Sequence, residues 1–72
     1  MKQYSVTQKK NRINDFIRGE LKRRKLSQEE LSFRLGLTQT GISKRLAGNV
    51  DWTLGELILL CEVLEIQLGD LE

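Results

Sequence analysis

The sequence has no histidine, no proline and a single cysteine, and each of these features excludes a class of protein. One cysteine cannot form an internal disulfide, so the fold does not depend on an oxidising compartment. A zinc site needs about four nitrogen or sulfur ligands, which one thiol without histidine cannot supply. The lack of proline favours uninterrupted helices, because proline removes a backbone donor and clashes with the preceding helical turn.

The residues of common active sites are also missing. The chain has no histidine, no glycine-rich phosphate loop and no nucleophile with a base beside it. No apolar run approaches the roughly 20 residues that span a bilayer, and the first residues lack the apolar core of a secretion signal. We therefore expect a cytosolic protein that is not an enzyme, with no catalytic residue, metal, cofactor, membrane partner or small-molecule substrate.

Seventy-two residues are enough for one domain and leave no room for an effector domain beside it. The chain is 39% hydrophobic and 31% charged, a composition typical of folded globular domains. A domain of this size buries only about 60% of the surface of its unfolded chain, so we expect modest stability.

The net charge of +2 hides a strong polarity along the chain. Residues 1–26 hold nine Lys and Arg against two acidic residues, whereas residues 49–72 hold six acidic residues and no Lys or Arg. One end therefore suits a polyanion and the other repels it. The basic run from Lys22 to Lys25 is either a segment that steers or contacts DNA or an ordinary solvated helix face.

Hydrophobic periodicity predicts an all-α fold. Residues 1–8 are polar and aperiodic, and we expect a flexible N-terminal arm there, with the folded domain over residues 9–72. A first helix is expected over about residues 9–24. Its apolar residues follow the spacing of one helical face: Ile13, Phe16, Ile17 and Leu21.

Capping signals divide the middle of the chain into two short helices. Ser27, followed three residues later by Glu30, is a capping box that opens the second helix. Gly36 lies where a left-handed residue would end that helix, and Thr38 is the next candidate N-cap. A third helix is expected over about residues 39–46. Two helices separated by about three residues, with a glycine in the turn, form the helix-turn-helix pattern.

A second capping box, Thr53 with Glu56, predicts a fourth helix over about residues 53–64, and residues 68–72 are expected to add one more turn. The apolar residues of the fourth helix lie on two nearly opposite sides. The side expected to face inward holds Leu54, Leu57, Cys61 and Leu64. The other side is the predicted dimer interface, formed by Leu59, Val63 and Ile66. Cover by the N-terminal arm or by the chain end is the alternative for that side.

Two single residues are interpreted as packing residues. Trp52 precedes the cap of the fourth helix and is expected to be a packed anchor rather than a surface aromatic that meets DNA. Cys61 is expected to be a small core residue rather than a redox switch.

The third helix carries the residues that we expect to read DNA. The major groove admits one α-helix, and each base pair presents its own pattern of donors, acceptors and methyl groups there. The side of the helix away from the core holds polar side chains suited to such contacts: Gln39, Thr40, Ser43 and Lys44. Phosphate contacts are expected from residues at helix starts or after the third helix: Gln28, Thr38 and Asn49. The alternative is an ordinary solvated helix face.

Residues 26–71 resemble the lambda repressor-like helix-turn-helix family of phage repressors and Cro proteins, and most of all its small Cro-type members. The positions that carry the resemblance are Gln28, Leu31, Ser32, Gly36, Thr38, Gln39, Ile42, Gly48, Leu57, Cys61, Leu64 and Leu71. The resemblance implies a compact fold of four or five helices. It also implies base contacts by Gln39, Thr40, Ser43 and Lys44 and phosphate contacts by Gln28 and Asn49.

Three departures from the family pattern change the expectations. Leu46 and Leu21 stand where many relatives carry a Glu and an Arg, so we infer an apolar contact in place of a buried ion pair, an exchange that need not lower stability. Arg45 occupies a position that is usually apolar, which predicts either a rotated helix end or a phosphate contact. Glu65 replaces the usual glycine after the fourth helix and leaves the end of that helix open.

The sequence therefore predicts a sequence-specific, DNA-binding transcriptional regulator: a phage or mobile-element Cro-like repressor that binds operator DNA as a homodimer. Two alternatives stay open. An antitoxin-like protein-interaction module would use the acidic end and the apolar side of the fourth helix first and bind DNA secondarily. A non-specific architectural protein is the other alternative, although base-blind binding mainly needs Lys and Arg.

Overall fold

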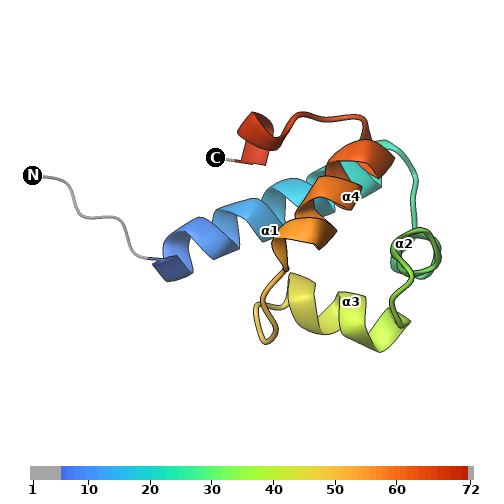
Figure 1. Ribbon diagram of the computed structural model, residues 1–72, viewed down its shortest axis with the longest axis horizontal. Helices are drawn as coiled ribbons and strands as arrows, with labels where there is room; N and C mark the ends of the chain where they lie inside the picture. The colour runs from blue at the N-terminus through green and yellow to red at the C-terminus, as the bar shows by residue number, and fades with distance from the viewer. Residues whose placement is uncertain (1–5, 72) are drawn as a thin grey trace, which may run out of the picture.

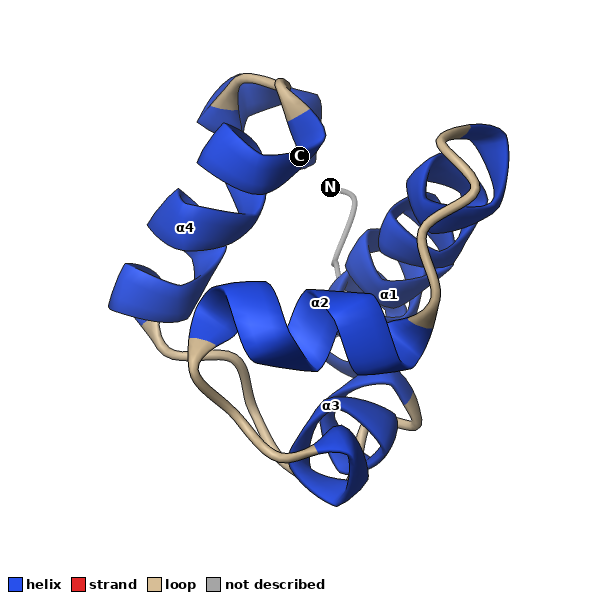
Figure 2. Cartoon of the chain, turned by 90° about the vertical axis from the view of Figure 1, so that its right-hand side faces the viewer, coloured by secondary structure: helices blue, strands red, loops and turns tan. Residues whose placement is uncertain are grey.

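The computed structural model describes residues 6–71, and this range contains helices and no strand. The elements are α1 (Val6–Arg23), α2 (Gln28–Leu35), α3 (Gln39–Leu46), α4 (Leu54–Leu64) and the 3-10 helix η1 (Leu68–Leu71). In Figure 1 α1 runs along the long axis, α2 is seen nearly end-on, and α3 lies at the lower edge. Figure 2, turned by 90°, shows α2 passing between α1 and α4 with α3 beneath it. The expected all-α architecture is confirmed.

The helix boundaries lie close to the predicted ones, with one clear difference at the N-terminal end. α1 begins at Val6, about three residues earlier than predicted. Of the arm predicted over residues 1–8, residues 6–8 are therefore helical, and residues 1–5 lie outside the described residues, as does Glu72. At the other end, the expected last turn is a 3-10 helix.

The two predicted capping boxes differ in completeness. The Thr53 hydroxyl accepts from the Glu56 N–H at 3.1 Å, and the Glu56 carboxylate accepts from the Thr53 N–H at 3.0 Å, so both halves are present. The Ser27 hydroxyl accepts from the Glu30 N–H at 3.0 Å. The Glu30 carboxylate, however, accepts from Arg34 Nε at 3.1 Å. At α2 the Ser27 cap is therefore present, while the Glu30 side chain serves an ion pair along the helix.

One hydrophobic core joins all five elements. Its buried members are Ile17, Leu21, Leu31, Leu35, Ile42, Leu46, Leu60, Leu64 and Leu71. Leu21 and Leu46 both belong to it, in agreement with the apolar contact inferred for these two positions.

The inward side of α4 differs from the prediction at one residue. Leu60 is fully buried, whereas Leu54, which was predicted to face inward, is 66% exposed. Six residues separate the two, which at about 100° per residue places them about 120° apart around the helix. Leu57 and Cys61 are partly buried against the core, and Leu64 is fully buried, as predicted.

Candidate nucleic-acid interface

The turn between α2 and α3 has the geometry that the glycine predicts. Gly36 adopts φ 68° and ψ 28°, in the left-handed region, where a residue with a Cβ costs roughly 1–2 kcal/mol. The next N–H, of Leu37, donates to the Ser32 carbonyl at 2.9 Å and closes the end of α2. The Thr38 hydroxyl then accepts from the Gly41 N–H at 2.9 Å and opens α3. The turn is therefore fixed by local hydrogen bonds on both sides.

α3 has a buried side and an exposed side. Ile42 and Leu46 point into the core, with 0% and 2% exposure. The side chains predicted to contact bases are all exposed: Gln39, Thr40, Ser43 and Lys44. None of the four side chains has a hydrogen bond or ion pair to another residue within residues 6–71. Because α3 also lies at the edge of the molecule in both views, these polar groups are available to a ligand (Figures 1 and 2).

Sequence reasoning missed one residue next to this exposed side. Ala47 caps the C-terminal end of α3 and is exposed. It follows Ser43 by four residues, a spacing that could have placed it on the same side. An Ala methyl group suits apolar contact with the methyl group of thymine.

The residues predicted to contact phosphates lie at the ends of the two short helices. Gln28 is the first residue of α2, Thr38 caps α3, and Asn49 follows the end of α3. All three are exposed. The Thr38 hydroxyl uses its oxygen as an acceptor for the cap and retains its O–H as a donor. Their contacts with phosphate stay a prediction.

Arg45 lies on the inward side of α3, and its guanidinium is engaged inside the domain, so the expected phosphate contact is not formed by it. Its Nε and Nη2 donate to the two carboxylate oxygens of Glu56 at 2.9 and 3.0 Å, and its Nη1 donates to the Gly41 carbonyl at 3.0 Å. The hydrogen bond to Arg45 lowers the pKa of Glu56 against the opposing effect of burial, and the backbone of Thr53 lowers it further. The same hydrogen bond raises the pKa of Arg45. The guanidinium therefore serves an internal ion pair instead of an outside phosphate.

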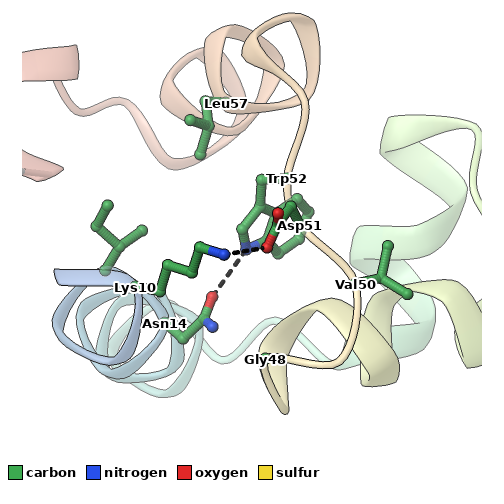
Figure 3. Close-up of a pocket in the computed structure, with 8 residues that line it drawn as sticks. Lys10, Asn14, Gly48, Val50, Asp51, Trp52 and Leu57 are labelled. Atoms are coloured by element: carbon green, nitrogen blue, oxygen red, sulfur yellow. Dashed lines mark hydrogen bonds and ion pairs between the residues drawn. The ribbon is translucent and has the colours of Figure 1, made fainter. Parts of the chain in front are cut away.

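The loop between α3 and α4 is tied to α1, as Figure 3 shows. Trp52 Nε1 donates to the Asn14 side-chain oxygen at 2.8 Å, and Lys10 Nζ lies 2.7 Å from the Asp51 carboxylate. Asn14 is only 4% exposed. The interpretation of Trp52 as a packed anchor is confirmed. No local signal predicts the Asn14 contact, because its partner lies 38 residues further along the chain.

The comparison with protein families agrees with this geometry. A family model described as helix-turn-helix matches residues 17–71, which is most of the chain. The chain belongs to the helix-turn-helix family. The match is of the Cro/C1 type, in agreement with the resemblance to the lambda repressor-like family, and the domain is accordingly a DNA-binding domain of transcription regulation. Searches of curated proteins and of solved structures found no match.

The end of α4 in this helix-turn-helix domain forms without the usual glycine. Glu65 adopts φ 55° and ψ 43°, the left-handed conformation that glycine takes most easily, and its N–H bonds back to α4. Cys61, one turn earlier, packs partly buried against the core, as predicted. Burial raises the pKa of its thiol, and the nearby Asp70 charge adds to the effect.

The helix-turn-helix domain leaves part of α4 and η1 apolar and exposed. Of the predicted dimer residues, Leu59 is 40% exposed, whereas Val63 and Ile66 are partly buried and pack against the core. Other apolar side chains of α4 and η1 are also exposed: Leu54, Ile58 and Leu68. Leu54 and Leu68 also line a groove whose other walls include Lys9 and Arg12 of α1. None of the helices in residues 6–71 has the length and hydropathy needed to span a membrane.

Proposed function

We propose that this helix-turn-helix protein is a sequence-specific regulator that reads operator DNA with the exposed side of α3. The observation that carries the proposal is that its polar side chains share one exposed side and have no partner within the described chain: Gln39, Thr40, Ser43 and Lys44. Gln can bond both N6 and N7 of adenine, and Lys favours O6 and N7 of guanine. The methyl group of Thr40 suits contact with the methyl group of thymine.

Contacts with the DNA backbone would fix the orientation of α3. Gln28 and Thr38 are exposed at helix N-termini, where free N–H groups and the helix dipole favour phosphate. Asn49 is exposed after the C-terminal end of α3, where its side-chain amide is the group that would donate to a phosphate. Such contacts set the register of a protein on the duplex and carry no sequence information directly. The basic first third of the chain adds attraction that depends on the salt concentration.

The regulator acts as a homodimer and as a Cro-like repressor of a phage or mobile element. The exposed apolar residues of α4 and η1 support self-association, because a small monomer rarely leaves such a surface uncovered. We assign the dimer interface to Leu59, Val63 and Ile66. A two-fold dimer reads two half-sites about 34 Å apart, and it represses by occluding polymerase on DNA in the cytoplasm.

The same apolar surface also favours a second candidate function. In an antitoxin-like protein-interaction module, this surface and the acidic C-terminal third would bind another protein first, and DNA binding would be secondary. The solution mass of the purified chain distinguishes the two: a homodimer supports the repressor, and a monomer supports the interaction module.

Selection of bound duplexes from random DNA with the purified chain tests the proposal. We expect an enriched motif with two-fold symmetry, bound roughly 10³-fold or more tightly than random duplex at physiological salt. The affinity for random duplex should fall steeply with salt, because it depends on counterion release. If no motif is enriched at moderate salt, the chain is not a sequence-specific regulator.

A further inference from the structure

The inward side of α3 is joined to the rest of the domain by a directional network centred on Arg45. Its guanidinium reaches the Gly41 carbonyl of its own helix, the Glu56 carboxylate of α4 and, at 6.0 Å, the ring of Trp52. Trp52 in turn is bonded to Asn14 of α1, as seen in Figure 3. The network therefore connects α3 with α1, α4 and the loop before α4.

The Glu56 carboxylate takes part in both the ion pair with Arg45 and the capping box of α4. Its Oε1 accepts from Arg45 Nε at 2.9 Å and from the Thr53 N–H of the capping box at 3.0 Å. The side chains of Arg45 and Glu56 are only 15% and 14% exposed, so salt screens this pair less than a surface pair. The start of α4 and the inward side of α3 are thus held by the same carboxylate.

Gly41 allows this network to approach the backbone of α3. A Cβ at this position would lie 3.1 Å from both Arg45 Nη1 and the Thr38 hydroxyl. Both contacts are tighter than nine in ten real Cβ contacts, so a Cβ here would push the guanidinium or the cap away by a few tenths of an ångström. The small residue therefore leaves room for the guanidinium and the cap at the first turn of α3.

α3 needs such a network because it is short. It has eight residues, and isolated helices shorter than about 12 residues are marginal in water. Burial of Ile42 and Leu46 holds α3 against the core, but apolar burial is non-directional and sets the rotation of a helix only weakly. A bidentate Arg–carboxylate pair adds geometric specificity.

We propose that Arg45, paired with Glu56, is a positioning residue that fixes the rotation of α3 about its axis. It touches no base itself, and it sets the direction in which the exposed polar side of α3 points. Side-chain ends lie roughly 6 Å from a helix axis, so a rotation of about 10° moves them by about 1 Å. Hydrogen bonds to bases tolerate about 0.5 Å. A small rotation therefore breaks base contacts, and this inference rests on the proposed function.

Paired substitutions test the role of Arg45. Arg45→Met removes the charge and keeps an apolar stem, and Glu56→Gln removes the ion pair while an amide oxygen can still close the capping box. In each variant, and in the double variant, we expect the ratio of operator to random-duplex affinity to fall about tenfold, the contribution of one bidentate base contact. In the double variant this affinity ratio should fall no further than in either single variant, because each of the three variants breaks the same Arg45–Glu56 pair.

Two further variants distinguish the bidentate geometry of Arg45 from its charge, and the loss of this ion pair from the loss of an ion pair elsewhere in the domain. Arg45→Lys keeps the charge but cannot form the bidentate fork, so it should not restore the ratio. Arg34→Met removes an arginine from the more exposed pair with Glu30 on α2, whose side chains are 46% and 48% exposed. The Arg34→Met ratio should stay within about threefold of the wild type, because surface pairs contribute little.

A measurement on the free protein tests the positioning role of Arg45 without relying on an operator sequence. Residual dipolar couplings of the α3 amides report its orientation relative to α4. We expect them to change in Arg45→Met and Glu56→Gln and to stay the same in Arg34→Met. Unchanged couplings, or a folded Arg45→Met chain that keeps the wild-type affinity ratio, would overturn the positioning role. If the couplings change in these two variants but the wild-type chain prefers no DNA site, the positioning role is supported and the proposed function is overturned instead.

Discussion

The two sides of α3 differ in how firmly their side chains are held. On the exposed side, polar groups such as those of Gln39 and Ser43 have no partner within residues 6–71. On the inward side, Ile42 is fully buried and Arg45 is bonded to both Glu56 and Gly41. An eight-residue helix does not hold its shape alone. The firmly held side is therefore what makes the free side usable as a reading surface.

The largest expected difference between the two sides is in stability. Ile42→Ala on the inward side should lower the free energy of unfolding by about 2–5 kcal/mol, because it leaves a cavity in the core. Ser43→Ala, its neighbour on the exposed side, should change it by less than about 0.5 kcal/mol. Urea denaturation followed by circular dichroism measures the free energy of unfolding of both variants. Equal losses would mean that α3 has no distinct buried and exposed sides.

The second difference is in DNA binding. Gln39→Ala should cost about 1–3 kcal/mol on the selected operator and little on random duplex, because only the base contact is lost. Gln67→Ala removes an exposed glutamine ahead of η1 and serves as the matched control. Fluorescence anisotropy gives both dissociation constants for each variant. An equal loss of affinity on operator and random duplex would remove Gln39 from the reading surface.

A smaller effect concerns the left-handed residues that end α2 and α4. Gly36→Ala should lower the free energy of unfolding by about 1 kcal/mol, because the strain lies in the backbone and nothing would lie within 4 Å of the new Cβ. Glu65→Gly should raise it by about 0.5 kcal/mol, since the relief of strain is partly offset by a more flexible unfolded chain. Thermal unfolding of the two variants checks these opposite signs.

The smallest expected effect is a change in the pH dependence of stability. The pKa of Glu56 lies below its ordinary value of 4.5 in the folded chain, mainly because of the hydrogen bond from Arg45. A carboxyl group of this kind contributes stability above its unfolded-state pKa and loses it as the pH falls through the folded-state pKa. The wild type should therefore lose stability below about pH 4.5 more steeply than Glu56→Gln or Arg45→Met. Identical slopes in urea titrations at several pH values would argue against the ion pair.

The features that could be predicted from the sequence are local ones. Ser27, Thr38 and Thr53 cap their helices, and Gly36 ends α2, because each acts through residues only a few positions away. The exposed side of α3 followed from helical spacing for the same reason. A short stretch of sequence contains all the information that these features need.

The features that could not be predicted depend on distant partners. Arg45 meets Glu56 across 11 residues, and Arg18 Nη2 donates to the Leu46 carbonyl across 28, at 2.5 Å. The inward side of α4 was also ambiguous, because apolar residues surround much of that helix and the spacing alone does not decide between Leu54 and Leu60. Only the packed fold selects one side.

The most direct test of the reading surface is an NMR titration of the nitrogen-15-labelled chain with the selected operator duplex. We predict that the largest shift changes fall on the α3 amides from Gln39 to Lys44 and on the Gln39 side-chain amide, with smaller changes at Gln28 and Asn49. Changes concentrated on α4 and η1, with α3 unaffected, would contradict the assignment of α3 as the helix that reads DNA.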